Sequence, residues 1–259
     1  MARAGSGRLR DKVAVVTGAA SGFGEGTARR FAAEGAAVVV ADCNGEGAEL
    51  VAKELRAAGH RAVAETVDVA VDDEVRALLD RAVERHGRID VLFNNAGVGM
   101  EPTPLEDVTD EVFRRIAEVN MFGVLAGCRA VIPIMKAQGS GVILNMASTA
   151  AVRPRPLLNV YNASKAFVLT LTKTLALELA PYGVRVNAIN PVMGETAMLK
   201  VFTGVEELDN ERRAAVVGTI PLGRLSTPDD IAWAATYLAS DEASLVTGIG
   251  LEVDGGRDV

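Results

Sequence analysis

Tyr161 and Lys165 are the residues whose types and spacing first suggest chemistry. They stand four residues apart inside a mostly apolar stretch, and on a helix this spacing places both side chains on one face. A lysine ammonium beside a tyrosine hydroxyl favours the phenolate, because a nearby opposite charge shifts a pKa by roughly 1–3 units. The pair therefore predicts that Tyr161 transfers a proton near neutral pH. Tyrosine and lysine at this spacing are also common as a simple helix-surface pair.

The composition limits the classes of function. The 259 residues are 49% hydrophobic, enough for a buried core, and the net charge is −7. Since nucleic-acid-binding domains usually carry a basic patch, we expect no nucleic-acid partner. His60 and His86 are the only histidines, which excludes a multi-histidine metal site, and we expect no metal.

The cysteines and the N-terminus point to a cellular compartment. Cys43 and Cys128 are the only cysteines, and neither belongs to a C-x-x-C motif, which favours free thiols in a reducing compartment. No apolar run reaches transmembrane length, and the first ten residues lack the apolar core of a signal peptide. We therefore expect a cytoplasmic protein with no membrane partner.

A glycine-rich turn follows the first predicted strand, residues 12–17. It runs from Thr17 to Gly24, and an amphipathic helix then extends to about Glu34. In a strand–turn–helix unit such glycines let the backbone approach a pyrophosphate, and the helix N-terminus offers free N–H groups. The alternative is a merely flexible turn.

Asp42 ends the second predicted strand, residues 36–41, eighteen residues after Gly24. A carboxylate at this position accepts hydrogen bonds from the ribose hydroxyls of adenosine and repels a 2′-phosphate. No lysine or arginine occurs in residues 17–24 or 43–47 to offset that repulsion. The sequence therefore predicts NAD(H) as the cofactor rather than NADP(H).

Polar or small residues also follow later predicted strands. Asp68 and Val69 end the strand at 61–67, where Asp68 contacts adenine, caps the next helix, or does both. The strand at 89–93 leads to the small polar corner at 94–97, which suits the close approach of a ligand. Asn120 lies on the apolar face of a predicted helix at 109–136. A buried asparagine needs partners, so Asn120 is either a structural bridge or a site residue.

The alternation of strands and helices predicts one parallel doubly wound sheet, a Rossmann fold with helices on both faces. No linker divides residues 1–259, so we expect a single domain, with a solvated tail at residues 1–10 and a substrate loop at 192–220. The polar strand ends, including Ser148 and Pro191, should meet at one edge of the sheet. That convergence favours a site over a surface pair for Tyr161 and Lys165.

These motifs together resemble the short-chain dehydrogenase/reductase family in its compact single-domain form. The resemblance covers residues 12–256. It rests on Thr-Gly-x-x-x-Gly-x-Gly at 17–24, Asn-Asn-Ala-Gly at 94–97, Asn120, Ser148, and Tyr-x-x-x-Lys at 161–165. One departure is Val192, which follows Pro191 where the family usually has glycine, so the nearby loop path is expected to differ.

The resemblance implies a role for each residue. Tyr161 would be the acid or base, Lys165 would lower its pKa and hold the nicotinamide ribose, and Ser148 would stabilise charge on the substrate oxygen. Asn120 would position a water in a proton relay. The expected cofactor contacts are Gly18, Ser21, Gly22, Phe23, Gly24, Asp42, Asp68, Val69, Asn95, Ala96, Gly97, Tyr161, Lys165, Pro191 and Thr196. The resemblance also implies a homotetramer built on helices 109–136 and 161–180, with which the apolar Val168, Leu169, Leu171 and Leu175 are compatible.

Two segments are candidates for contact with the substrate. Arg153 and Arg155 either meet an acidic substrate group or are solvent-exposed or in a subunit contact, and we favour the second interpretation. The apolar residues of 193–205 are either a substrate lid or ordinary packing. If they form a lid, the substrate is moderately apolar.

The sequence as a whole predicts an NAD-dependent oxidoreductase acting on a small-molecule secondary alcohol/ketone pair. A 3-oxoacyl thioester reductase or a sugar or polyol dehydrogenase remains an alternative within the family. A dinucleotide-binding sensor without turnover is an alternative of another class. The intact set Ser148, Tyr161 and Lys165 argues against the sensor.

Overall fold

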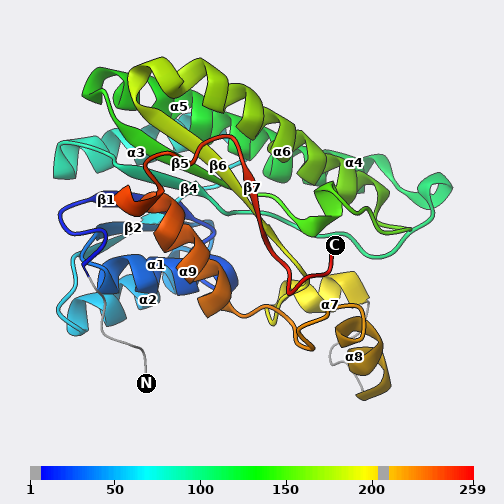
Figure 1. The fold of residues 1–259 in the computed structure, drawn as a ribbon. Helices are drawn as coiled ribbons and strands as arrows, with labels where there is room; N and C mark the ends of the chain where they lie inside the picture. Colours follow the sequence, from blue (N-terminus) through cyan, green and yellow to red (C-terminus); the bar gives the residue numbers. More distant parts are fainter. Residues whose placement is uncertain (1–6, 204–209) are drawn as a thin grey trace.

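The computed structural model describes residues 7–203 and 210–259. Within them, seven parallel strands form one sheet (Figure 1). The strands are β1 Val13–Thr17, β2 Ala37–Asp42, β3 Ala62–Thr66, β4 Val91–Asn94, β5 Gly141–Met146, β6 Val184–Pro191 and β7 Gly250–Val253. The helices are α1 Gly22–Ala33, α2 Gly45–Ala57, α3 Asp72–His86, α4 Asp110–Ile116, α5 Gly123–Gln138, α6 Asn159–Leu179, α7 Met198–Thr203, α8 Asn210–Val217 and α9 Pro228–Ala239.

The strand order is β3-β2-β1-β4-β5-β6-β7, and every neighbouring pair is parallel. The order reverses between β1 and β4, and ligands of doubly wound sheets bind in the crevice outside the strand ends at such a point. The predicted Rossmann fold is thus confirmed.

Helices cover both faces of the sheet (Figure 1). One core joins the sheet to α3, α5 and α6, and the other joins it to α1, α2 and α9. Side chains alternate along each strand, so on β1 Val15 enters the first core whereas Ala14 and Val16 enter the second. All three are fully buried. The sheet is therefore a rigid middle layer that holds the loops at its carboxyl edge.

The predicted N-terminal tail is shorter than ten residues. Leu9 is fully buried, its N–H donates to the Glu34 carbonyl, and Arg8 pairs with Glu242. An apolar side chain next to the core is stabilised by burial, so residues 7–10 are held against α1. Residues 1–6 lie outside the described residues.

The predicted helix at 109–136 is one continuous helical segment with a π-helical turn, Ala117–Phe122, between α4 and α5. By length and composition this segment, Asp110–Gln138, could cross a membrane, so the expectation that no apolar run has that length is wrong. Half of its most apolar window is buried within the protein, where Val124, Val131 and Met135 join the first core. The segment is thus packed as a core helix of the sheet layer.

Four apolar residues of α6 are compatible with a subunit interface by sequence, but in the structure they contribute to the chain's own core. Val168 and Leu175 are buried, and Leu169 and Leu171 pack against the same cluster. The large apolar residue exposed on this helix is Leu177, with 81% of its surface accessible. The four residues therefore give no support to an interface.

Candidate active site

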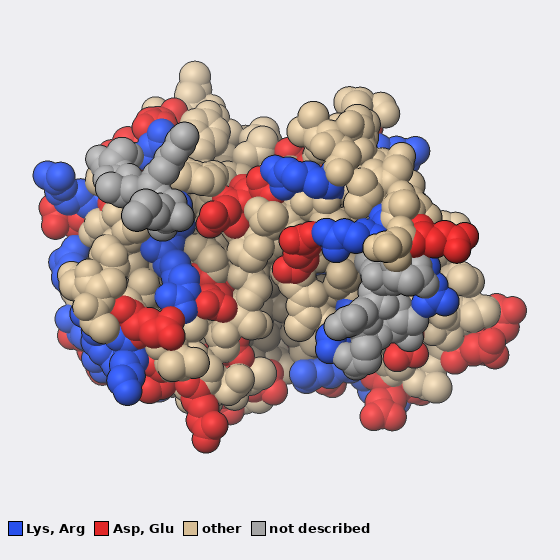
Figure 2. Space-filling model, turned by 90° about the horizontal axis from the view of Figure 1, so that it is seen from below, with Lys and Arg blue, Asp and Glu red and all other residues tan. Residues whose placement is uncertain are grey.

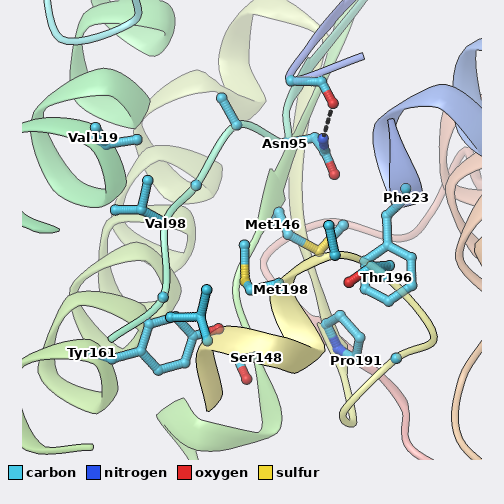
Figure 3. A pocket seen from close by; sticks show the side chains of 18 of the residues that line it. Phe23, Asn95, Val98, Val119, Met146, Ser148, Tyr161, Pro191, Thr196 and Met198 are labelled. Atoms are coloured by element: carbon cyan, nitrogen blue, oxygen red, sulfur yellow. Dashed lines mark hydrogen bonds between the residues drawn. The ribbon is translucent and has the colours of Figure 1, made fainter. Parts of the chain in front are cut away.

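Ser148, Tyr161 and Lys165 lie together at the carboxyl edge of the sheet. Ser148 follows β5, and its Oγ accepts a hydrogen bond from the Ala150 N–H (3.1 Å). Tyr161 lies in the first turn of α6 with Lys165 one turn later, and 6% and 4% of their surfaces are exposed. Figure 3 shows the Tyr161 hydroxyl directed toward Ser148. The predicted helix and the shared face of the pair are therefore present.

Burial, rather than the neighbouring lysine, dominates the pKa of Tyr161. Burial raises this pKa to about 12, although hydrogen bonding with Ser148 and the charge of Arg155 act in the opposite direction. The Lys165 Nζ donates to the Met146 carbonyl (2.8 Å) and lies 5.8 Å from the centre of the Tyr161 ring. Burial also lowers the pKa of Lys165 to about 8. The prediction that Lys165 favours the phenolate near neutral pH is wrong for the cofactor-free chain, where Tyr161 keeps its proton.

A cavity of about 510 Å³ opens at this edge, and the face in Figure 2 is hollowed between two bulkier regions with acidic and basic side chains interspersed. Most of the predicted site residues line the cavity. They are Gly18, Ser21, Gly22, Phe23, Asp42, Asp68, Val69, Asn95, Ala96, Gly97, Ser148, Tyr161, Lys165, Pro191 and Thr196. Gly24 and Asn120 do not line it.

The glycine turn forms a tight cradle beside Asn95. Gly18 has φ +64°, and a Cβ there would lie 2.8 Å from the Ala96 Cα, closer than real contacts allow. The Asn95 Nδ2 donates to the carbonyls of Thr17 (2.9 Å) and Gly18 (3.1 Å; Figure 3). A Cβ on Gly24 would lie 2.0 Å from the Gly18 oxygen, so Gly24 lets α1 pack against the turn rather than facing the cavity. The cradle fits a dinucleotide, whose pyrophosphate needs close backbone approach at a helix N-terminus.

Asp42 is held at the other end of the cavity by backbone amides. Its Oδ2 accepts from the Ala20 N–H and its Oδ1 from the Asn44 N–H, both at 2.9 Å. The cationic residues that line the cavity are Arg115, Arg155 and Lys165, and all three come from segments other than 17–24 and 43–47. The carboxylate is therefore fixed at the cavity without a neighbouring cation from either segment.

Asp68 closes a turn rather than capping a helix. Its Oδ1 accepts from the Ala70 N–H (3.0 Å), whereas the N-cap of α3 is Val71, with no side-chain cap bond. The helix-cap interpretation is wrong, because α3 begins four residues after Asp68.

Asn120 lies behind the cavity wall, in the π-helical turn. It is fully buried, its Oδ1 accepts from the Val98 N–H (2.8 Å), and its Nδ2 donates to the Val98 carbonyl and the Ser164 Oγ. Gly97 separates it from Lys165: a Cβ on Gly97 would lie 3.3 Å from the Asn120 Oδ1 and 3.5 Å from the Lys165 Nζ. The side chain thus joins the π-helical turn to the loop after β4 and to α6, next to Lys165.

Val192 adopts ordinary extended pairing. Its N–H donates to the Val253 carbonyl (3.2 Å), which continues the β6–β7 ladder, and its side chain packs with Ile220 and Leu225. Among the described residues only Asp11 and Leu157 are non-glycine residues with positive φ. Valine is therefore accommodated without strain, and Thr196 still lines the cavity.

Helix α7 covers the cavity with apolar side chains. Met198, Leu199, Val201 and Phe202 line it, and the Phe202 ring meets the Tyr161 ring edge-on with centroids 4.9 Å apart. Figure 3 shows Met198 between Tyr161 and Phe23, which lie on opposite sides. Much of the stretch between Met193 and Phe202 thus lines the cavity, which both the lid and the packing interpretation allow, and residues 204 and 205 lie outside the described part.

Two contributors were not found by sequence reasoning. The Met146 carbonyl anchors Lys165, and Cys43 lines the cavity beside Asp42. A backbone carbonyl leaves no signal in residue types, whereas the position of Cys43 directly after the carboxylate could have indicated it.

Comparison with known proteins agrees with this geometry. A family model described as "Enoyl-(Acyl carrier protein) reductase" matches residues 18–258. The 4-formylbenzenesulfonate dehydrogenase of Comamonas testosteroni is 47% identical over 97% of this chain and 99% of its own. The cis-4-hydroxycyclohexanecarboxylate dehydrogenase of Sinomonas cyclohexanicum is 42% identical over 95% and 96%. The structure of a 3-ketoacyl-(acyl-carrier-protein) reductase from Brucella melitensis, complexed with NADH, has a TM-score of 0.90 and 47% identity over 97% of this chain and 100% of that one.

Proposed function

Because the chain belongs to the short-chain dehydrogenase/reductase family, we propose that it is an NAD-dependent oxidoreductase that interconverts a secondary alcohol and a ketone. The observation that carries the proposal is the meeting of Ser148, Tyr161 and Lys165 at one cavity whose far end holds Asp42. A sensor without turnover would not need a buried proton donor there.

The proposed mechanism divides the work between the cofactor and the chain. A bound nicotinamide dinucleotide would supply or accept the hydride. Tyr161, protonated at neutral pH, donates its proton to the ketone oxygen during reduction and recovers it during oxidation. Ser148 donates a hydrogen bond to the same oxygen and stabilises the charge that develops on it.

Lys165 and Asn120 are proposed to support this proton transfer. Lys165, buried and anchored on the Met146 carbonyl, holds a positive charge near the catalytic tyrosine and would contact the ribose of a bound nicotinamide. Asn120, next to Lys165 in the π-helical turn, positions a water that relays the proton outward. A π-turn within a helix is often found at a functional site.

NAD(H) is the proposed cofactor because of Asp42. Its carboxylate is fixed by two amides where the adenosine ribose would lie, so it accepts hydrogen bonds from the 2′- and 3′-hydroxyls and repels a 2′-phosphate. The other proposed contacts are Gly18, Ser21, Gly22, Phe23, Asp68, Val69, Asn95, Ala96, Gly97, Pro191 and Thr196, while Gly24 acts through packing.

The proposed substrate carries a six-membered ring. The walls near Tyr161 are apolar, with Val98, Leu158, Met198 and Phe202, which suits a ring better than a sugar or polyol. The hydroxycyclohexanecarboxylate named for the relative with 42% identity has such a ring. A 3-oxoacyl thioester is the second candidate, favoured by the similarity to a 3-ketoacyl reductase.

The test is a substrate panel followed by NADH absorbance. It contains cyclohexanol, 4-hydroxycyclohexanecarboxylate, 4-formylbenzenesulfonate, acetoacetyl-CoA (assayed in reverse with NADH) and galactitol, each with NAD and NADP cofactors. Steady turnover of a ring alcohol with NAD is expected. If acetoacetyl-CoA alone is turned over, the substrate class is 3-oxoacyl thioesters rather than ring alcohols. If no compound is turned over, the sensor without turnover is favoured.

We also propose the compartment in which the enzyme acts and its oligomeric state. Cys43 and Cys128 are both free, which suits the reducing cytoplasm, and residues 1–259 would act as one domain within a homotetramer. Light scattering of the purified protein measures that assembly.

A further inference from the structure

Arg155 is a cation that lines the cavity. It comes from the loop between Ser148 and α6, is half-buried, and lines the cavity. Within residues 7–203 and 210–259, no carboxylate pairs with its guanidinium, and no hydrogen bond from that group is found. A charge withdrawn from water is normally paired, so this position is unusual.

Asp258 does not satisfy Arg155. Asp258 attracts the guanidinium electrostatically, yet both Asp258 carboxylate oxygens are buried without a hydrogen-bond partner. The charge of Arg257 repels Arg155. Arg155 therefore remains available to a group inside the cavity.

The position of Arg155 places it on the substrate side. Its charge acts on the Tyr161 hydroxyl, the group that would meet the reacting oxygen. The glycine turn, where the cofactor pyrophosphate would lie, is on the opposite side of the cavity, as the places of Phe23 and Tyr161 show (Figure 3). The two other arginines of interest differ, because Arg115 lines the cavity but is exposed, and Arg153 is exposed and bonded to the Arg257 carbonyl.

We propose that Arg155 binds an anionic substituent of the substrate, a carboxylate or a sulfonate. A planar guanidinium donates two parallel hydrogen bonds to such a group, and the apolar walls contact the substrate ring. This inference rests on the proposed function and narrows its substrate class to ring alcohols and ketones with an acidic group.

The test measures binding apart from turnover. The enzyme saturated with NADH is titrated by calorimetry with 4-hydroxycyclohexanecarboxylate and with the neutral 4-hydroxycyclohexanecarboxamide, neither of which reacts with the reduced cofactor. The wild type is expected to bind the carboxylate about 10- to 100-fold more tightly. Arg155→Gln should reduce the preference to within about threefold, and Arg155→Lys should restore part of it.

Arg153→Gln is the matched control, since it removes the same charge from the same loop outside the cavity. It is expected to keep the preference. Equal binding of both ligands by the wild type would overturn the inference, as would an unchanged preference in Arg155→Gln or an equal loss in Arg153→Gln. NADH affinity and melting temperature of each variant show that the fold is retained.

Turnover separates the two proposals. If the wild type oxidises the carboxamide as efficiently as the carboxylate, the proposed function stands and the anion site fails. If the carboxylate binds with the expected Arg155-dependent preference but neither compound is oxidised, the anion site stands and the proposed function fails.

Discussion

Tyr161 and Lys165 are both shifted toward their neutral forms by burial. The pKa of Tyr161 rises to about 12 and that of Lys165 falls to about 8, because each charged form loses its hydration inside the protein. In the cofactor-free chain, Tyr161 is thus a protonated acid, and burial destabilises the charged form of the nearby Lys165. Such opposing shifts in one cavity are typical of catalytic groups.

Lys165→Met should stabilise the protein while abolishing turnover. At pH 7 we expect the free energy of unfolding to rise by about 1–3 kcal/mol, since the buried charge disappears and one hydrogen bond is lost. The folded pKa of Lys165, about 8, lies below the ordinary value of 10.5, so the unfolded state binds more protons between these pH values. The free energy of unfolding of the wild type therefore rises with pH between about 8 and 10.5. The stabilisation that Lys165→Met brings becomes smaller over the same range. Chemical denaturation at pH 7 and pH 10 measures both.

The control for this prediction is Lys173→Met, an exposed lysine on the same helix. It should change stability little at either pH. If Lys165→Met is less stable than the wild type at pH 7, burial of the charged Lys165 does not lower the free energy of unfolding, and the prediction is wrong.

At the scale of the element, α6 and α7 both line the cavity near Tyr161, where the substrate would bind. α6 could be predicted from its sequence because helix formers and the terminal Pro181 and Gly183 mark its bounds. α7 is shorter, and the sequence predicts only a substrate loop at 192–220 in its place. Its helix is defined by packing over the cavity, which local propensity does not encode.

Phe202→Ala should weaken substrate binding. The ring forms a cavity wall and meets Tyr161 at 4.9 Å, so its loss should raise the KM for a ring alcohol by about 5- to 30-fold with little change in NADH affinity. Phe113→Ala, at an exposed position on α4, is the control. An unchanged KM for every substrate would mean that α7 is ordinary packing.

At the scale of the whole molecule, the sequence predicts that the strand ends meet at one edge of a parallel sheet, but it does not predict the pKa values. Asp42, Asn95 and Ser148 are far apart in sequence, yet each lies at or just after the end of a strand of one parallel sheet, so topology alone brings them to one edge. The sign of the Tyr161 shift depends on how deeply α7 and the loop after β4 bury it. The Met146 contact of Lys165 depends on where β5 ends. Neither quantity is a property of a local motif.

The preference for NAD over NADP is attributed to Asp42, at the cofactor end of the cavity. Asp42→Asn keeps the size of the side chain but removes the negative charge, so the ratio of kcat/KM for NAD over NADP should fall at least about tenfold. Kinetics with both cofactors at a fixed alcohol concentration measure this ratio. A ratio that does not change would remove Asp42 from the account.

The most direct measurement of the central claim is steady NADH formation from a ring alcohol by the wild type and by Tyr161→Phe, with NADH affinity measured on both. The wild type should turn over. Tyr161→Phe should lose about 10²- to 10⁴-fold in kcat while binding NADH normally, and Tyr182→Phe, at an exposed site, should keep its activity. Turnover by Tyr161→Phe at the wild-type rate would contradict the assignment of Tyr161 as the proton donor.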